Sequence, residues 1–362
     1  MIRTSVKASK SYEIYTGSGL LDSCGKVMRE VSPQSTKLLI ISESNVAPLY
    51  LDRVKDSAVS EGLEVFTYAF EAGEASKNIN TISRMWGVMA KAGFTRTDLV
   101  AALGGGVTGD MAGFAAATFL RGINVVQIPT SLLAMVDASV GGKTGIDLPE
   151  GKNQVGAFWQ PSAVIEDTDC LKTLPDEVFT EGMAEVIKYA YIMDTSLYRL
   201  LEEKAFLGIG IREDAALMER IVGMCVADKA DVIMSDEFDN GRRQTLNYGH
   251  TVGHVIERNS NFTKPHGVCV AKGMGIIIDA CEKAGTLASE EASKMRALIK
   301  AYGLPVDDDI TPEDMVSGAM NDKKKRGNTL SVILVNKIGV SEIKKMTPDE
   351  FLKFLKGDGA PC

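Results

Sequence analysis

The stretch DLVAALGGGVTGD, residues 98–110, decides the fold more than any other part of the chain. Its first six residues are mostly apolar and predict a buried strand, which glycines follow at once. Gly104, Gly106 and Gly109 fit the pattern GxGxxG between a strand and a helix, where backbone amides at the helix N-terminus can face a pyrophosphate. The alternative is a glycine turn that only lets strand and helix pack tightly.

Three further apolar runs predict strands at residues 37–42, 62–69 and 123–128, with helical patterns between them. Alternation of strands and helices predicts a parallel sheet with helices on both faces. From about residue 174 the pattern changes. Helical periodicity covers residues 177–203, 212–230, 249–258 and 267–284, and one more strand is expected at residues 329–335. The chain is therefore expected to have an α/β domain followed by a mostly helical one, with a boundary near Thr173.

A simple dinucleotide-binding fold carries an acidic residue about 20 residues after its glycines, where it holds the ribose. No strand in that region of this chain ends in one. The candidates lie upstream: Glu43 with Asn45 after the first strand, and Glu74 with Lys77 in a loop that contains glycine. We therefore expect a bound nucleotide within a topology that departs from the standard one.

Composition excludes several classes of protein. The chain has 362 residues and a net charge of −8, which argues against a general binder of nucleic acid or of anionic membranes. The basic run at residues 323–326 is expected to be a solvated turn or a local anion site. Six scattered cysteines without a CxxC pair predict no disulfide framework, and neither a secretory signal nor a membrane span is recognised. A cytoplasmic location is the default expectation.

All three histidines, His250, His254 and His266, fall within 17 residues. His250 and His254 are separated by four residues and share one helix face, and His266 opens the next predicted helix. A metal site usually adds a carboxylate, and Glu185, on a predicted helix with Glu181 and Lys188, is the candidate. Spacing favours the pair His250 and His254 without deciding which histidines bind metal. The motif HTVGH is not HExxH, so a zinc-peptidase interpretation has no general base.

Cationic and amide side chains surround these motifs. Such a set suits a substrate that carries phosphate and carboxylate groups, although any single lysine is more often a solvated surface residue. Arg243, Asn247 and His250 are spaced by four and three residues, so they share a face if the helix begins that early. The set consists of Arg121, Lys143, Lys152, Asn153, Lys188, Lys229, Arg243 and Asn247.

Seven segments together resemble the 3-dehydroquinate synthase family of the sugar phosphate cyclase superfamily. They run in order from about residue 102 to residue 327: ALGGGVTGDMAGFAAATFLRGI, IPTSLLAMVDASVGGKTGID, GKNQVGAFWQP, TEGMAEVIKYA, LNYGHTVGHVIE, PHGVCVAKGM and NDKKKRG. The resemblance implies an N-terminal Rossmann-like NAD-binding α/β domain, residues 1–173, and a C-terminal, mostly α-helical, metal- and substrate-binding domain, residues 174–362. It also implies an active site in the cleft and a homodimer.

The resemblance assigns roles to individual residues. Glu185, His250 and His266 correspond to the family's metal ligands, with zinc or cobalt as the metal, so His254 becomes a catalytic or substrate-contacting residue. The implied substrate contacts and catalytic residues are Asp137, Lys143, Asn153, Lys188, Lys229, Arg243, Asn247 and His254, with Lys323 or Lys324 on the phosphate and Arg121 reaching the partner subunit's site. The implied NAD contacts are Glu43, Asn45, Glu74, Lys77, Gly105, Gly106, Val107, Thr108, Gly109, Asp110, Thr130, Ser131, Lys143, Lys152, Cys170, Leu171, Lys172 and Thr173.

The implied activity is that of a carbon–oxygen lyase acting on phosphates, in the shikimate pathway of aromatic amino acid biosynthesis. Its substrate is 3-deoxy-D-arabino-heptulosonate 7-phosphate, which is oxidised transiently by NAD, loses phosphate by β-elimination, is reduced again and closes to 3-dehydroquinate in an intramolecular aldol step. Three alternatives remain: a cyclase for a neutral sugar phosphate, a metal-dependent polyol or glycerol-phosphate dehydrogenase, and a non-enzymatic nucleotide-binding regulator. Lys229, Arg243, Asn247 and His254 together favour a substrate with a carboxylate.

Overall fold

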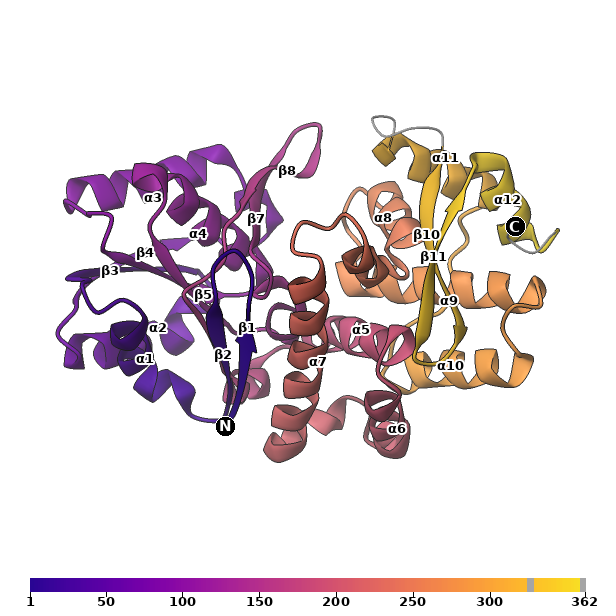
Figure 1. The fold of residues 1–362 in the computed structure, drawn as a ribbon, viewed down its shortest axis with the longest axis horizontal. Coiled ribbons are helices and arrows are strands. Elements are labelled where there is room, and N and C mark those ends of the chain that lie inside the picture. Colours follow the sequence, from indigo (N-terminus) through magenta and orange to yellow (C-terminus); the bar gives the residue numbers. More distant parts are fainter. Residues whose placement is uncertain (324–328, 359–362) are drawn as a thin grey trace. The chain divides into compact units, whose positions relative to one another are not determined.

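A computed structural model describes residues 1–323 and 329–358, with the backbone alone at residues 321–323 (Figure 1). The chain forms two compact units. The first comprises Met1–Leu174 and Arg212–Phe238, and the second comprises Pro175–Ile211 and the part from Asp239 onward. This division differs from the expected contiguous second domain, residues 174–362, because Arg212–Phe238 packs with the first unit.

The first unit is built on a seven-stranded sheet with the strand order β1-β2-β9-β6-β5-β3-β4. Six of these strands run parallel, and β1 is added antiparallel at one edge. A separate hairpin is formed by β7 and β8. The bounds are β1 Ile2–Val6, β2 Tyr12–Gly17, β3 Lys37–Glu43, β4 Glu64–Phe70, β5 Leu99–Gly104, β6 Asn124–Pro129, β7 Lys143–Leu148, β8 Gly151–Phe158 and β9 Ala163–Asp167.

Helices cover both faces of this sheet, as the alternating pattern predicts. Figure 1 shows α1 and α2 on one face, and α3 and α4 on the other. The inner strands β5 and β9 are consequently buried along their whole length. The helices of the first unit are α1 Cys24–Val31, α2 Ala47–Ser60, α3 Ile79–Lys91, α4 Gly106–Thr118 and α7 Ala215–Ser235.

The predicted strand, glycine turn and helix are confirmed at the carboxyl edge of the sheet. Strand β5 ends at Gly104 and α4 begins at Gly106. The neighbouring strand β6 is in register, with Gly104 opposite Pro129, and the Thr130 amide donates to the Gly104 carbonyl at 3.0 Å. The glycine loop therefore lies where ligands bind in open α/β sheets, but it follows β5, the fourth parallel strand along the chain, and not the first.

The second unit is mostly helical, with one two-stranded hairpin. Helix α9 contacts α8, α5 and α10, so these helices form the core of the unit. No helix among the residues that the structure describes is long and apolar enough to cross a membrane. The bounds are α5 Asp176–Ile192, α6 Thr195–Lys204, α8 His250–Asn259, α9 His266–Lys283, α10 Ser289–Ala301, α11 Pro312–Lys323, β10 Leu330–Lys337, β11 Val340–Met346 and α12 Pro348–Lys356.

Two expectations about these helices need correction. The single helix predicted at residues 177–203 is two helices, because the Asp194 carboxylate accepts hydrogen bonds from the Ser196 and Leu197 amides and starts α6 anew. The helix with the histidines begins at His250, so Arg243 and Asn247 do not share its face. They lie in the preceding 3-10 segment η7, Arg242–Asn247, because Gly249 has a φ of 79° and breaks the helical path.

The sheet of the first unit contains a buried carboxyl group. Glu166 on β9 is fully buried, and the Thr16 hydroxyl on β2 donates to its Oε2 at 2.7 Å. Its Oε1 has no hydrogen-bond partner among the described residues. Burial raises the pKa of Glu166 to about 8, and the Thr16 hydrogen bond and the charge of Lys229 offset this only in part. The Glu166 side chain is therefore mostly neutral at pH 7.

This raised pKa makes folding stability depend on pH. The folded state keeps a proton that the unfolded state loses above about 4.5, so the stabilisation is complete below that pH and is lost as the pH rises toward 8. Glu166→Gln retains an acceptor for Thr16 and cannot ionise. We expect its free energy of unfolding to exceed that of the unsubstituted protein by up to about 4 kcal/mol at pH 8.5, and by little at pH 5. Urea unfolding at both pH values measures this, and an identical pH dependence in the two proteins would contradict it.

Candidate functional site

The three histidines come together in the second unit, as their spacing predicts. His250 is the first residue of α8, His254 follows one turn later, and His266 is the first residue of α9. Their possible ligand atoms all lie within 4.8 Å of one another. The rings of His250 and His266 have centroids 5.3 Å apart. A cluster of three imidazoles this tight is a suitable set of donors for a metal ion.

Glu185 on α5 faces this cluster with a carboxylate that is almost completely buried. The residue is 1% exposed, and its Oε1 lies 3.5 Å from Nε2 of His250 and 3.9 Å from Nε2 of His266. The Lys188 ammonium group makes an ion pair with Oε2. Neither oxygen has a hydrogen bond of acceptable geometry within the described part of the chain. A buried carboxylate beside imidazoles and without such bonds has the character of a metal ligand.

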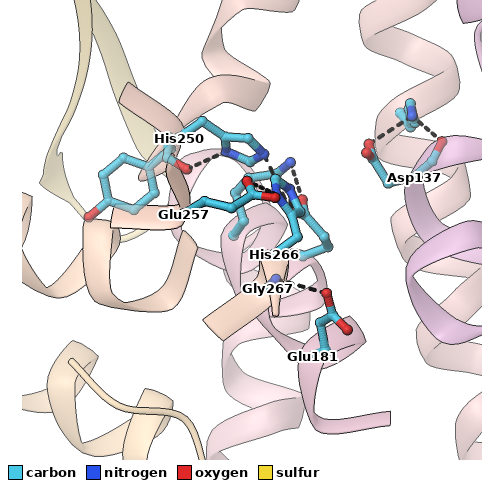
Figure 2. Close-up of polar contacts among 10 residues, drawn as sticks. Asp137, Glu181, His250, Glu257, His266 and Gly267 are labelled. Carbon is cyan, nitrogen blue, oxygen red and sulfur yellow. Dashed lines mark hydrogen bonds and ion pairs between the residues drawn. The ribbon is translucent and has the colours of Figure 1, made fainter. Parts of the chain in front are cut away.

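Close approach of helix backbones brings these side chains together. A Cβ atom at Gly273 of α9 would lie 2.0 Å from the Gly249 carbonyl oxygen, directly before α8. A Cβ at Gly267 would lie 2.1 Å from the Glu181 carbonyl oxygen on α5. The Gly267 amide also donates to the Glu181 carboxylate at 3.2 Å (Figure 2). Both positions require glycine, and the N-terminus of α9 is fixed against α5 with His266 next to Glu185.

The imidazoles of His250 and His266 have opposite pKa shifts. Burial and the positive charge of Lys188 hold the pKa of His250 well below its usual range, so its ring is neutral at pH 7. Burial also acts to lower the pKa of His266, but its hydrogen bond with Glu257 and the charges of Glu185, Glu257 and Glu181 raise it overall. The surroundings therefore favour the protonated ring at His266, whereas His250 has a neutral ring that can donate an electron pair to a metal ion.

The predicted substrate-contacting residues of the second unit differ in exposure. Lys188 and Arg243 are buried, whereas Asn247 and His254 are exposed. Lys188 lies on α5, one turn after Glu185, as predicted. Arg243 and Asn247 lie in η7, directly before the turn that leads to His250. Lys323 is the last residue of α11, and its side chain and all of Lys324 lie outside the described residues.

In the first unit, the glycine loop and its predicted neighbours lie at the carboxyl edge of the sheet. Gly105, Gly106, Val107, Thr108, Gly109 and Asp110 form the N-terminal part of α4 and its cap. Thr130 and Ser131 follow β6, and the Ser131 hydroxyl accepts a hydrogen bond from the Ala134 amide at 3.3 Å. Glu43 ends β3, and its carboxylate accepts from the amides of Asn45 and Val46 at 2.7 and 3.1 Å.

The glycines of this loop are of two kinds. A Cβ at Gly113 on the next turn of α4 would lie 2.4 Å from Cγ2 of Thr144, so that glycine is required for packing. A Cβ at Gly105 would meet only the Ser131 hydroxyl, at 3.5 Å, and the φ of Gly105 is −74°. Packing therefore does not require glycine at position 105. An approaching ligand remains a reason for glycine at position 105.

A network of charged side chains connects this loop to the β7–β8 hairpin. The Lys77 ammonium group is buried and donates to Asp110 Oδ2 at 2.7 Å and to Asn153 Oδ1 at 2.5 Å. Lys152 lies 3.7 Å from Glu74. Burial acts to lower the pKa of Lys77, but the charges of Asp110 and Glu74 raise it overall. The structure thus brings five predicted residues into one cluster.

Two further groups of predicted residues lie in the first unit. Asp137, in the π-helical segment η4 Ala134–Ala138, accepts a hydrogen bond from Lys229 of α7 at 2.7 Å on Oδ1, and Lys229 also contacts its carbonyl oxygen. In the 3-10 segment η5 Thr168–Thr173, the side chains of Cys170 and Leu171 are buried and those of Lys172 and Thr173 are exposed. Only backbone atoms of the two buried residues can face a ligand.

Two further predicted residues are exposed. Lys143 is exposed at the start of β7. Arg121 is exposed after the C-terminus of α4, with a φ of 68°. Since α4 has 13 residues, Arg121 lies about 20 Å from the glycine loop of its own chain. The structure of one chain therefore does not bring Arg121 to the predicted nucleotide site.

Glu257 and the backbone carbonyl of Tyr248 contact the histidines and were not predicted from the sequence. Nδ1 of His266 lies 3.2 Å from Glu257 Oε2, and Nδ1 of His250 lies 3.1 Å from the Tyr248 carbonyl oxygen (Figure 2). The only available sequence pattern was the spacing of Glu257, seven residues after His250 and thus on the same helix face.

Comparison with known proteins agrees with these features. The chain matches the family model described as 3-dehydroquinate synthase N-terminal over residues 67–181, and the one described as 3-dehydroquinate synthase C-terminal over residues 182–325. The 3-dehydroquinate synthase of Clostridium acetobutylicum is 40% identical over 351 residues, 96% of this chain and 96% of that protein. The enzyme of the same name from Lactococcus lactis subsp. cremoris is 41% identical over 349 residues, 95% and 97% of the two chains.

Similar solved structures show the fold. A 2-deoxy-scyllo-inosose synthase, complexed with carbaglucose-6-phosphate, NAD+ and Co2+, matches with a TM-score of 0.86 at 22% identity, over 99% of this chain and 100% of that one. A 2-epi-5-epi-valiolone synthase from Streptomyces hygroscopicus subsp. jinggangensis, with NAD+ and Zn2+ bound, matches with a TM-score of 0.86 at 24% identity, over 98% of each chain. A probable glycerol dehydrogenase from Sinorhizobium meliloti matches with a TM-score of 0.65 at 16% identity, over 95% of each.

The buried pair of Lys188 and Glu185 leads to a prediction about the metal-free protein. Glu185→Gln leaves the Lys188 ammonium group buried without its carboxylate, so we expect the free energy of unfolding to fall by about 3–5 kcal/mol. The double variant Glu185→Gln with Lys188→Met removes both charges and should recover most of that loss. Urea unfolding after dialysis against a chelator measures all three proteins.

The matched control is the exposed pair of Glu290 and Lys294, whose atoms lie 2.7 Å apart. Glu290→Gln should change the free energy of unfolding by less than about 1 kcal/mol. Equal losses for Glu185→Gln and Glu290→Gln would contradict the role given to the buried pair.

Proposed function

The chain belongs to the 3-dehydroquinate synthase family, and we propose that it carries out this family's reaction with the residues placed above. It is a lyase that converts 3-deoxy-D-arabino-heptulosonate 7-phosphate into 3-dehydroquinate and inorganic phosphate. The observation on which the proposed site rests is the buried Glu185 carboxylate facing two imidazoles. Its requirement for positive charge in a dry environment supports a bound divalent cation.

Glu185, His250 and His266 are the proposed ligands of that cation, which is zinc or cobalt. The distances of 3.5 and 3.9 Å join Glu185 to Nε2 of these two histidines, whereas His254 is exposed. This favours the family's ligand set over the pair His250 and His254 that spacing alone favours. When bound, the cation supplies a Lewis acid that lowers the pKa of a coordinated hydroxyl group, and NAD supplies a hydride acceptor that returns its hydride within the same turnover.

The proposed contribution of the chain's own residues is to bind and orient the substrate and to move protons. Positively charged groups suit the two anionic ends of the substrate. His254 is exposed beside the proposed ligands, and imidazole titrates near neutral pH, so it is the proposed proton relay. The proposed phosphate contacts are Lys152, Asn153, Arg243 and one of Lys323 and Lys324, and the proposed carboxylate contacts are Lys229, Arg243 and Asn247.

The carboxyl edge of the first unit is the proposed NAD site. Backbone amides at the start of α4 and the room at Gly105 suit a pyrophosphate, which carries negative charge. Glu43 ends β3, and Glu74 and Lys77 follow the carboxyl end of β4 in the same sheet. These positions fit the rule that nucleotides bind outside the carboxyl ends of parallel strands. The proposed site also includes the other residues that the resemblance implies as NAD contacts.

The assembly state and the location are also proposals. An exposed Arg121, about 20 Å from the glycine loop of its own chain, supports a homodimer in which it contacts the partner's site. Five cysteines lie in the described part of the chain, and all are free and buried, which is typical of a reducing compartment such as the cytoplasm. A membrane or nucleic-acid partner is not part of the proposal, since the net charge is −8.

The experiment is a turnover assay with the heptulosonate phosphate and NAD+ at a concentration below that of the substrate. We expect many molecules of phosphate and dehydroquinate per NAD+, loss of activity after chelation, and recovery with zinc or cobalt. NAD+ should not be consumed, because its hydride returns to the product. If NADH instead accumulates steadily with a polyol as substrate and no phosphate is released, the proposed function is wrong and the protein is a dehydrogenase.

Histidine variants serve as controls for the metal site. His254→Ala should keep one equivalent of metal and lose activity, whereas His250→Ala should lose the metal. A neutral hexose phosphate should not be a substrate, since it lacks the carboxylate. Metal loss in His254→Ala and retention in His250→Ala would contradict the proposed ligand set.

A substitution in the glycine loop tests the NAD site separately. Gly105→Ala introduces a methyl group at ordinary contact distance from the protein, so we expect the melting temperature to stay within about 2 °C. If the pyrophosphate approaches the backbone here, affinity for NAD+ should fall at least tenfold, about 1.4 kcal/mol. Calorimetric titration with NAD+ measures the affinity, and thermal unfolding measures the melting temperature.

Gly113→Ala on the same helix is the matched control. Its methyl group overlaps Thr144 on β7, so we expect a loss of stability of about 1–3 kcal/mol. Affinity for NAD+ in the folded fraction should change less than in Gly105→Ala. Unchanged NAD+ binding in Gly105→Ala would argue against backbone contact at this position.

A further inference from the structure

The two imidazoles proposed as metal ligands make different contacts through their Nδ1 atoms. Nδ1 of His250 lies 3.1 Å from the Tyr248 carbonyl oxygen, and Nδ1 of His266 lies 3.2 Å from Glu257 Oε2 (Figure 2). A carbonyl and a carboxylate accept hydrogen bonds and do not donate them. These contacts place a proton on Nδ1 of each ring, and in the neutral ring this leaves the Nε2 lone pair on the side of Glu185.

The acceptor of His250 is part of the backbone, and its position follows from the turn before α8. Gly249 has a φ of 79°, and a Cβ there would lie 2.7 Å from the Val270 carbonyl oxygen. The turn therefore requires glycine and fixes the Tyr248 carbonyl beside the ring of His250. The acceptor of His266 is instead a side chain. This contact can be removed by substitution without changing the backbone.

The position of Glu257 is fixed by the end of α8. It lies two turns after His250 on the same helix and is 4% exposed. Its carbonyl oxygen accepts hydrogen bonds from the Ser260 hydroxyl at 2.7 Å and the Phe262 amide at 2.9 Å, where the chain turns toward α9. Helix α8 thus provides one proposed ligand, His250, and also Glu257, which contacts the other histidine ligand, His266.

We propose that Glu257 is a positioning residue of the metal site. Its carboxylate orients the ring of His266, fixes the Nδ1–H tautomer and increases the electron density that Nε2 offers to the metal. Partners of this kind are worth 10–100-fold in metal affinity or activity in other metal sites. This inference rests on the proposed function, because it needs a metal at Glu185, His250 and His266.

The test measures metal affinity of the full-length protein after removal of bound metal. Zn2+ and Co2+ are titrated against a competing chelator for Glu257→Leu, Glu257→Gln and the unsubstituted protein. We expect the dissociation constant to rise about 10–100-fold in Glu257→Leu. The rise should be smaller in Glu257→Gln, whose amide oxygen still accepts a hydrogen bond. The visible spectrum of bound Co2+ should change in Glu257→Leu, which reports a change in ligand geometry.

Glu181→Gln is the matched control. Glu181 is a second carboxylate close to His266, but its hydrogen bond goes to the Gly267 amide and not to the ring. If only negative charge near His266 matters, Glu181→Gln and Glu257→Gln should weaken metal binding equally. If the contact with Nδ1 matters, we expect the dissociation constant of Glu181→Gln to stay within about threefold of the unsubstituted value.

Nitrogen-detected NMR of the histidine rings, in the unsubstituted protein without metal at pH 9, gives a readout that needs neither activity nor a stable variant. We expect the His266 ring to be protonated on Nδ1. An Nε2–H tautomer would overturn the inference, as would equal metal affinity in Glu257→Leu and the unsubstituted protein. An unsubstituted protein that binds no metal would instead overturn the proposed function, so the two failures are distinguishable.

Discussion

Glu185 carries a negative charge at a position that is 1% exposed, and a charge removed from water must be balanced by its neighbours. Lys188 provides part of that balance, and the imidazoles of His250 and His266 face the other oxygen. Because the Glu185 side chain is almost completely buried, water contributes little to this balance. The geometry of the second unit thus places a carboxylate where a cation is needed, and a divalent metal meets that need better than one ammonium group.

Similar compensation occurs in the first unit, where the buried cations are each held by an acidic partner. Lys77 contacts Asp110, and Lys229 contacts Asp137. These pairs let the positive groups stay inside the fold before any ligand arrives, although the whole chain is acidic. An anionic ligand then meets cations whose positions are already fixed, so less conformational entropy is lost on binding. Pairing therefore matters here more for preorganisation than for stability, to which buried ion pairs contribute little.

The fold could be predicted from the sequence wherever a pattern was local. The four predicted strands of the sheet match β3, β4, β5 and β6 to within two residues, because parallel strands form short, mostly apolar runs, whereas β1, β2 and β9 were not predicted. The β7–β8 hairpin was missed because its glycines and charges are typical of loops. It is stabilised instead by antiparallel pairing and by contact with α4. The packing of Arg212–Phe238 with the first unit depends on distant parts of the chain, which periodicity does not reveal.

The same distinction separates predicted from unpredicted residues of the site. His250, His254 and His266 could be found because histidine is rare in this chain and the three lie close in sequence. Glu257 could not be found in this way, because a glutamate on an amphipathic helix usually faces water. The burial of Glu257 results from the turn that leads to α9. A side-chain contact between two helices cannot be predicted until the positions of both helix backbones are known. In this protein residue type and spacing predict the histidine cluster, whereas the contact between Glu257 and His266 follows only from how α8 and α9 pack.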